Sequence, residues 1–468
     1  MRPGDECTAQ CFKQSQGQDK LNGLAATFLT LCGAAVLLVR RQHALIALLV
    51  GVCYIPAYVG VEIGGFNFTA IRVLIAVGLI RVLVRSERPV GPMTHIDRAM
   101  SAWAIWLVLS SLFRDNVVSA LVFRLGLVYD AVGIYVLVRA HCRTVEDAVA
   151  LARAAAIVLA PLALAMLYEQ ANNYNLFSLL GGVGEHPIVR EGRVRANGPF
   201  GHPILAGTVG AVCLPIMVGL WKTHPGRAKL GVLACVTIVL CSASSGPILS
   251  AVAGMFGIYL WRYRSRMRMI QKLAIAGYVL LELIMKDPAY FIIARVDLAG
   301  GSTSWYRARL IQSALEHLPE WWLAGTEYTR HWMWVVVSWS PNHTDITSHY
   351  IQLGVWGGLP LMLLFILVLW RGFAGVAEVV RCNTLLLPHL GYQIWALGAM
   401  LFALAVTGLS VSYFDQSFVF IYVALGSIGS AVSHIRCTTA AQPAIARAST
   451  VAPVAGSTPL PRRAGDSW

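Results

Sequence analysis

The chain has 468 residues, of which 57% are hydrophobic and 13% charged, and its mean hydropathy is +0.63. Soluble domains are roughly 45–50% apolar and about 25% charged, so this composition excludes a soluble globular protein and favours an all-α polytopic membrane protein. The formal net charge of +14 could suggest a nucleic-acid partner. We expect none, because the positive-inside rule accounts for Lys and Arg gathered between hydrophobic segments.

The first 23 residues are polar and lack the apolar stretch and small-residue cleavage site of a signal peptide. Hydrophobic segments near the ~20 residues needed to cross a bilayer follow, and we expect about 12–13 transmembrane helices. Ten of them lie in residues 24–286 and three in residues 350–436. The predicted helices are 24–40, 43–61, 66–84, 98–113, 117–140, 147–168, 203–221, 229–243, 246–262, 271–286, 350–371, 392–411 and 416–434.

The basic loops predict the orientation of these helices. Residues 261–272 carry five Lys or Arg side chains between two hydrophobic segments, so this loop is expected in the cytoplasm. Counting outward, the loops with Arg40 and Arg41, Arg85 and Arg88, Arg139 and Arg143, residues 222–229 and residues 371–381 fall on the same side. A short loop at 185–202 and a large loop at 287–349 then face the periplasm of a bacterium.

Two arginines, Arg72 and Arg124, lie inside predicted transmembrane segments, some six or seven residues from their outer ends. Charged residues within a bilayer are costly and indicate function by default, so both are candidate substrate-binding residues. Asp130 could neutralise Arg124 only if the helix packing brings the two together.

The first outer loop carries Arg190, Arg193 and Arg195, followed by a Gly/Pro-rich stretch that ends at His202 and Pro203. Proline favours the first turn of a helix, and helix N-termini attract anions. Contacts with lipid headgroups are the ordinary explanation for such arginines. Positive charge is normally depleted on the outer side, however, and we therefore expect Arg190, Arg193, Arg195 and His202 to bind an anionic ligand.

The second outer loop contains a predicted helix that separates two arginines. Arg307 is in line with apolar side chains at i+3, i+4, i+7 and i+11, whereas Arg309 shares the polar face with Glu316. We therefore expect Arg309 to be exposed to solvent. Arg307 needs a partner because it faces the packed side. Asp297 or Asp345 could supply it, and a bound phosphate would serve equally well.

The loop ends at His349, at the outer mouth of the next hydrophobic segment, with Gln352 one turn deeper. A helix N-terminus and nearby arginines disfavour imidazolium, so His349 is expected to be neutral near pH 7 and available as a general base. A histidine that hydrogen-bonds at a membrane interface is the alternative. The spacing of His343, Asp345 and His349 matches no known metal-ligand pattern, and no metal is expected.

Three motifs occur in order over roughly residues 180–370. They are Arg195-Ala-Asn-Gly-Pro-Phe-Gly-His202-Pro203, then Arg307 followed by Ala314-Leu315 and Pro319 to Gly325, and finally Ser348-His349-Tyr350 with Gly357-Gly358. Together they resemble the bacterial O-antigen ligase family and its O-antigen and exopolysaccharide polymerase relatives. The family often has His-Asn where this chain has His349-Tyr350, and about twelve helices with both termini inside.

The resemblance implies a fold like that of C-type glycosyltransferases and transfer of a glycan from undecaprenyl pyrophosphate to a hydroxyl. The acceptor would be lipid A–core in a ligase or another glycan in a polymerase. His349, Arg307 and Arg195 would be catalytic, and Arg193, Arg190, His202, Arg72, Arg124 and Gln352 would bind substrate. No cofactor is implied, and since the chain has no Asp-x-Asp motif, arginines would replace a divalent metal. The partners would be these substrates and membrane lipids.

A flippase for lipid-linked saccharides is an alternative from another class. It would be favoured by pseudo-symmetric halves, and no internal repeat is visible in this chain. The remaining segment, residues 437–468, is rich in Ala, Pro, Ser and Thr with scattered Arg, and we expect a disordered cytoplasmic tail.

Overall fold

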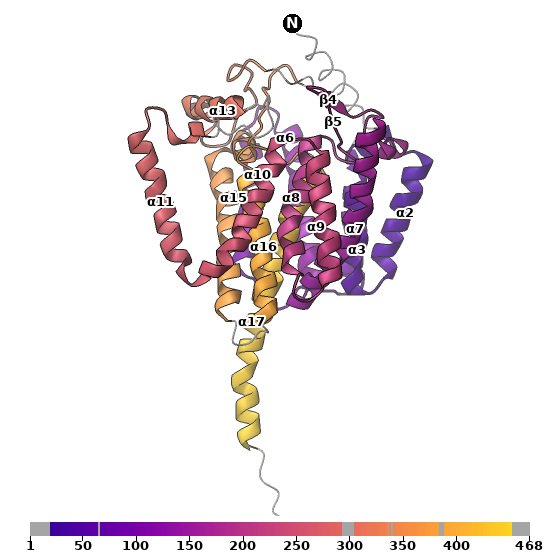
Figure 1. The fold of residues 1–468 in the computed structure, drawn as a ribbon, viewed down its shortest axis with the longest axis vertical. Coiled ribbons are helices and arrows are strands. Elements are labelled where there is room, and N and C mark those ends of the chain that lie inside the picture. Colours follow the sequence, from indigo (N-terminus) through magenta and orange to yellow (C-terminus); the bar gives the residue numbers. More distant parts are fainter. Residues whose placement is uncertain are drawn as a thin grey trace, which may run out of the picture.

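The computed structural model describes residues 19–63, 66–292, 304–335, 337, 340–382 and 388–451, and these are mostly helical (Figure 1). Each predicted hydrophobic segment coincides with a helix. These helices are α2 (Gly23–Leu38), α3 (Arg41–Tyr54), α4 (Ala70–Val84), α5 (His95–Leu109), α6 (Val117–His141), α7 (Val145–Asn172), α8 (Pro203–Gly219), α9 (Pro225–Cys241), α10 (Ser245–Tyr259), α11 (Met267–Ile284), α15 (His349–Arg381), α16 (Pro388–Thr407) and α17 (Val419–Val451).

Shorter elements fill the connections. The short helices are η1 (Ser110–Phe113), η2 (Leu176–Leu180), η3 (Leu260–Arg266), η4 (Ala289–Phe291), α13 (Ser304–Glu316), α14 (Leu318–Trp321) and η6 (Gln416–Phe418). The strands are β1 (Asp19–Lys20), β2 (Val59–Ile63), β3 (Phe66–Thr69), β4 (Ile188–Arg190) and β5 (Arg193–Arg195). They form one sheet in the order β1-β2-β3 and the hairpin β4-β5, a small exception to the all-α prediction.

Among the described residues, six helical segments are long and apolar enough to cross a membrane, and the chain is therefore a multi-pass membrane protein. They are His95–Phe113, Val117–His141, Val145–Asn172, His349–Arg381, His389–Thr407 and Gln416–Thr439. The helices Gly23–Leu38, Arg41–Tyr54 and Pro203–Gly219 are apolar but shorter.

Helix α8 lies inside the bundle, against α9, α10 and α16. It is apolar on all sides and nearly every residue in it is buried, as expected for a helix surrounded by other helices. Its first residue is Pro203, which sits at a position whose N–H needs no helical partner. This confirms the predicted helix start directly after the first outer loop.

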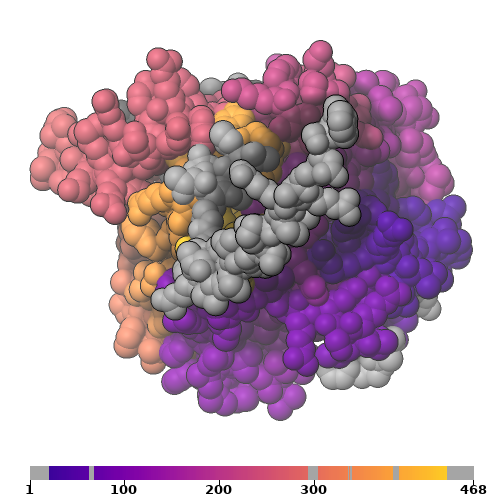
Figure 2. All heavy atoms as spheres, turned by 90° about the horizontal axis from the view of Figure 1, so that it is seen from below, coloured from indigo at the N-terminus to yellow at the C-terminus, as the bar shows by residue number. Residues whose placement is uncertain are grey.

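Helix α11 stands apart from the bundle, at the edge of the molecule in both views (Figures 1 and 2). None of its side chains is buried, and its neighbours among the described elements are η3 and η4. It connects the basic stretch at η3 to the large loop that carries α13.

Helix α15 is kinked at Gly357 and Gly358, and Gly358 has a φ of +79°. A Cβ at Gly358 would lie 2.1 Å from the carbonyl oxygen of Leu323, so a side chain has no room there. The kink separates residues 349–356 from the long remainder of the helix.

Side chains from the α5–α6 region bind the backbone carbonyls at this kink. Trp106 donates its indole N–H to the Gly357 carbonyl at 2.8 Å. Arg114 donates to Val355 at 2.9 Å, and Arg124 donates to the Trp356 carbonyl. A break in a helix leaves carbonyls that need such donors, and these side chains therefore hold the kink in place.

The two ends of the bundle carry different loops. At one end α13 and the β4-β5 hairpin lie together, and α17 projects from the other end (Figure 1). Helix α7 has 28 residues, about 42 Å at 1.5 Å per residue, and it links the two ends. Both predicted outer loops thus lie at one end. Helix α17 continues to Val451, so residues 437–451 are helical where a disordered tail was predicted, and residues 452–468 lie outside the described part.

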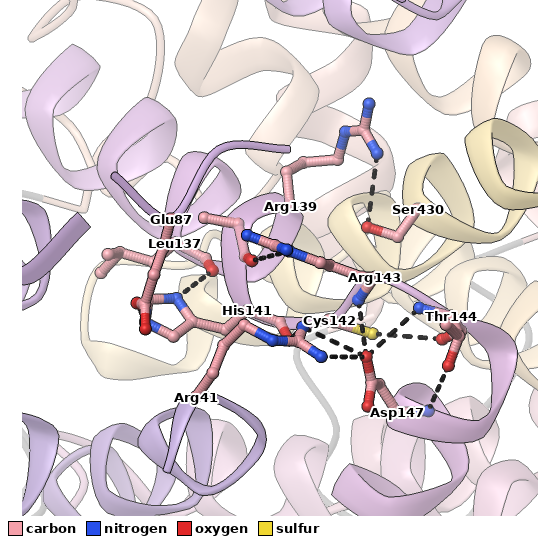
Figure 3. A network of polar contacts seen from close by, with 11 residues as sticks. Arg41, Glu87, Leu137, Arg139, His141, Cys142, Arg143, Thr144, Asp147 and Ser430 are labelled. Carbon is pink, nitrogen blue, oxygen red and sulfur yellow. Dashed lines mark hydrogen bonds and ion pairs between the residues drawn. The ribbon is translucent and has the colours of Figure 1, made fainter. Parts of the chain in front are cut away.

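The opposite end gathers several of the predicted cytoplasmic loops into one polar network (Figure 3). Arg41 binds the carbonyl of His141 and the Asp147 carboxylate, which lies 3.3 Å away. The same carboxylate accepts the backbone N–H of Arg143 at 2.8 Å. The loops after α2 and α6 therefore meet, as the counting of basic loops predicts.

Candidate functional site

The first outer loop folds into the β4-β5 hairpin, which sequence reasoning did not predict. Arg190 pairs with Arg193, and Ile188 with Arg195. The two-residue turn consists of Glu191 and Gly192, both with positive φ, as in the tight turns that suit hairpins. Residues two apart in a strand share a face, and so do cross-strand partners. The register therefore puts all three arginines on one face.

Like charges directly opposite each other destabilise a strand pair, and Arg190 faces Arg193 across this hairpin. The hairpin's tip thus carries two exposed guanidinium groups, with Glu191 in the turn between them.

Arg195 lies at the inner end of the hairpin and is 8% exposed. It donates to the hydroxyl of Ser244, at the start of α10, while its Nε is buried without a hydrogen-bond partner among the described residues. Burial, and next the charge of Arg190, lower the pKa of Arg195 to about 10. The side chain stays a cation at neutral pH, with a donor still to be satisfied.

Arg193 lines an open pocket beside the hairpin. The pocket holds about 340 Å³ and combines polar groups with aliphatic side chains of α9 and α10. Its lining residues are Gln170, Arg193, Val194, Leu240, Ala243, Ser244 and Ile248. A cationic side chain over an aliphatic wall suits an amphiphile with an anionic head.

The loop from Ala196 to His202 is held by a carboxylate of α7. Glu169 is 1% exposed and accepts the backbone N–H groups of Asn197 and Gly198 at 3.1 and 2.8 Å. Sequence reasoning missed this residue, and the available signal was an acidic residue at the end of a hydrophobic segment. Glu169 is a structural anchor for the Arg195–His202 motif.

A second anchor comes from the connection between α16 and α17. Asp415 accepts the N–H of Gly201 at 3.0 Å, and Gln416 donates to the carbonyl of Pro199 at 2.9 Å. These residues were also missed, since nothing local in the sequence relates position 415 to position 201.

His202 is the N-cap of α8, and its Nδ1 accepts the backbone N–H of Ile204 at 3.2 Å. Burial lowers the pKa of His202 to about 3, and the charges of Arg195 and Arg190 contribute. The ring is therefore neutral with its hydrogen on Nε2. His202 offers a hydrogen-bond donor to an anion rather than a positive charge.

The structure separates Arg307 from Arg309 on α13 as their helical phase predicts. Arg309 pairs with Glu316 at 3.7 Å. Arg307 is half-buried, and its Nε is buried without a hydrogen-bond partner in the described part of the chain. Burial lowers the pKa of Arg307, with Asp345 opposing and Arg190 adding to the effect. Asp297, the other suggested partner, lies outside the described residues.

The charge of Arg190 affects ionisable groups in both outer loops. Its charge lowers the pKa of Arg195 and His202 in its own loop, and also that of Arg307 in the other. Coulomb interactions of this kind fade with distance and screening. The charge of Arg190 therefore acts on groups of both outer loops, and Asp345 is the acidic group that acts on Arg307.

His349 begins α15 and is 7% exposed. Its ring packs edge-on against Phe365 and Tyr413, with centroids 5.2 and 5.1 Å away, and its Nδ1 has no hydrogen-bond partner among the described residues. The His349 backbone N–H donates to the Gly408 carbonyl at 2.8 Å. Gln352, one turn further on, is half-buried.

Residues 408–418 connect His349 to the first outer loop. Gly408 and Tyr413 contact His349, and Asp415 binds Gly201, the neighbour of His202. One connecting segment thus positions both histidines of the predicted site.

Arg72 and Arg124 are held elsewhere. The helix predicted at residues 66–84 begins at Ala70 in the structure, so Arg72 is the third residue of α4. Arg72 pairs with Asp130 at 2.8 Å. Asp130 therefore neutralises Arg72 and not Arg124, which binds the α15 kink. Their predicted role in substrate binding stays a prediction.

Within the described residues, one group of side chains could hold a metal ion: His317, Glu320 and His331. None of the predicted site residues belongs to it. No protein-family model and no curated protein matches this chain.

Proposed function

We propose that the protein transfers a glycan from undecaprenyl pyrophosphate to an acceptor hydroxyl at the periplasmic face of the bacterial inner membrane, as an O-antigen ligase-like enzyme. The observation that carries the proposal is the pair of arginines, Arg195 of the hairpin and Arg307 of α13, each with an Nε that has no hydrogen-bond partner among the described residues, next to the histidine-bearing loops. A lipid-linked pyrophosphate is an anion that must be bound at the membrane surface.

The leaving group explains why arginines would gather here. As the acceptor oxygen bonds to the anomeric carbon, the bond from that carbon to the pyrophosphate oxygen breaks, and negative charge develops on the pyrophosphate. Arginine donates paired hydrogen bonds to phosphate oxygens, and donors fixed before the reaction stabilise such charge. The Nε atoms of Arg195 and Arg307, which have no hydrogen-bond partner among the described residues, would supply such donors.

His349 would accept the proton of the attacking hydroxyl. Its ring lies in an aromatic surrounding with no carboxylate in contact among the described residues, which favours the neutral imidazole that a general base requires. His202 would donate its Nε2 hydrogen to a pyrophosphate oxygen. Gln352, one turn below His349, would bind the acceptor.

The mixed pocket beside Arg193 suits the lipid part of the donor, because its walls combine a guanidinium with leucine and isoleucine side chains. We infer 12–13 membrane crossings, with the hairpin end in the periplasm, since the basic loops gather at the other end. The chemistry needs no metal or cofactor at the arginines.

The test is a reconstituted assay. Purified protein in liposomes receives an undecaprenyl-pyrophosphate-linked saccharide together with lipid A–core. A ligase attaches the glycan to lipid A–core, and a polymerase lengthens the lipid-linked glycan. A flippase moves the donor across the bilayer without a covalent change. Absence of any glycan transfer would refute the proposal.

His349→Ala and His349→Gln should both abolish transfer, by at least the roughly 10²–10⁴-fold typical of a lost general base. The glutamine variant fills the space between Phe365 and Tyr413, which guards against a folding defect. His186→Gln, at an exposed histidine bonded to the Asn173 carbonyl, is the control. Normal glycan transfer by a well-folded His349→Gln variant would show that His349 is not the general base.

A further inference from the structure

The large loop carries a second cluster of chemically active side chains, at the end of α13 away from Arg307. The ligand-type atoms of His317, Glu320 and His331 all lie within 4.8 Å of one another. His317 follows Arg307 by ten residues, which is about 15 Å along a helix. The cluster is thus separate from the proposed glycan-transfer site.

The protonation of His317 leaves one ring nitrogen available for an ion. Its Nδ1 lies 2.8 Å from the Ser313 carbonyl oxygen, and a carbonyl only accepts, so Nδ1 carries the hydrogen. In the neutral ring Nε2 then has the free electron pair. A histidine that binds a metal commonly donates its other N–H to a carbonyl in this way, which sets the tautomer and the ring orientation.

Glu320 and His331 already face each other. The His331 Nε2 lies 2.9 and 3.0 Å from the two Glu320 oxygens, and Glu320 also accepts the indole N–H of Trp332 at 3.1 Å. Ring stacking holds both histidines, since Tyr328 stacks on His331 and Trp332 on His317. The ligands are therefore oriented by neighbours that do not themselves bind an ion.

We propose that His317, Glu320 and His331 bind a divalent ion of the zinc class, with a fourth position open to water. Two imidazoles and a carboxylate are a donor set that Zn²⁺ accepts in sites with an open position. Ligand atoms around a tetrahedral Zn²⁺ at 2.0–2.1 Å are about 3.3 Å apart. The hydrogen that His331 Nε2 donates to Glu320 would be released to solvent or carried on Nδ1 instead, because a nitrogen that binds a metal must be unprotonated. Glu320 and His331 would separate by a few tenths of an ångström, and the widest pair in the cluster would close.

The ion would fasten two parts of the loop to each other. His317 lies between α13 and α14 and Glu320 lies in α14, whereas His331 comes from the segment that leads towards His349. About a third of each of the Glu320 and His331 side chains is exposed, which gives an ion access from solvent. Metal binding should therefore stabilise the folded loop, because a preformed site is absent from the unfolded chain.

The experiment measures Zn²⁺ bound by the full-length chain, purified in detergent without a polyhistidine tag and stripped with a chelator. We expect one equivalent of Zn²⁺ per chain after dialysis and a higher thermal unfolding midpoint. Glu320→Gln and His331→Gln should each weaken binding at least tenfold, and His186→Gln should bind as the unaltered chain does. Glu320→Gln keeps an acceptor for Trp332, which protects the fold.

X-ray absorption of the Zn²⁺-loaded chain gives an independent readout. Nitrogen and oxygen neighbours with histidine scattering would support the site, whereas sulfur neighbours would assign the ion to cysteines and overturn it. Equal Zn²⁺ binding by the unaltered chain and both variants would overturn it as well. In that case His331 and Glu320 form an ion pair only. The measurement requires no glycan transfer, so its outcome is independent of the proposed function.

Discussion

Two arginines at each end of the helix bundle differ in their partners. At one end, Arg41 pairs with Asp147 (Figure 3), and Arg139 pairs with Asp97 at 3.1 Å. At the other end, the buried Arg195 binds a serine hydroxyl, and both it and Arg307 have an Nε without a partner among the described residues. Arginines paired with carboxylates link neighbouring helices. By contrast, Arg195 and Arg307 have N–H groups that could donate hydrogen bonds to a ligand.

The largest expected effect is a difference in stability between two variants, each with one arginine replaced at one end of the bundle. Arg139→Met removes the cation from Asp97 and leaves a carboxylate in a largely buried position, which typically costs about 3–5 kcal/mol. Arg195→Met leaves no carboxylate behind, and Ser244 keeps its hydrogen bond to the Ser242 carbonyl. The free energy of unfolding of the Arg195→Met variant should therefore differ from that of the unaltered chain by less than about 1 kcal/mol.

Thermal unfolding of both variants in the same detergent measures this difference. The double variant Asp97→Leu with Arg139→Met is the control, and it should recover much of the stability that Arg139→Met loses. If Arg195→Met destabilises the protein as strongly as Arg139→Met does, the contrast between the two ends fails.

The next effect concerns two arginines of one helix. Arg307→Ala should lower glycan transfer by about 10²–10³-fold, as expected when a donor to developing charge is removed. Arg309→Ala loses an exposed pair with Glu316 that contributes roughly 0–1 kcal/mol, and its activity should stay within a few-fold. Initial rates in the reconstituted assay compare the two, and equal losses would contradict their assignment to different faces.

The smallest effect is a dependence of stability on pH. The folded pKa of His202 is about 3, below the unfolded value of about 6.5. Between these values the unfolded state binds the additional proton, so the contribution of His202 is complete above pH 6.5 and is lost as the pH falls. Acidification from pH 7 to 5 should cost about 2 kcal/mol.

His202→Asn keeps an N-cap acceptor and removes the titration. The difference between its thermal unfolding midpoints at pH 7 and pH 5 should therefore be smaller than that of the unaltered chain. An identical acid sensitivity would show that folding leaves the pKa of His202 unchanged, and hence that burial and the nearby arginines do not lower it.

Sequence reasoning located the helices well and the polar partners poorly. The hydrophobic segments coincide with helices, and the phase of α13 separates Arg307 from Arg309, because both signals are contained in neighbouring residues. The hairpin at 188–195 was missed although Glu191-Gly192 provides a turn signal. Glu169 and Asp415 were missed because their hydrogen bonds link positions far apart in the chain.

The amino-acid sequence by itself determined that the chain is a helical membrane protein with basic loops at one end and two polar loops at the other. Apolar length and charge distribution act segment by segment, without knowledge of the neighbours. Only the tertiary structure decided which cation meets which carboxylate. Asp130 binds Arg72, and Arg124 binds the α15 kink. Such pairings depend on how the helices are rotated and packed against one another, and the sequence of a single segment does not determine either.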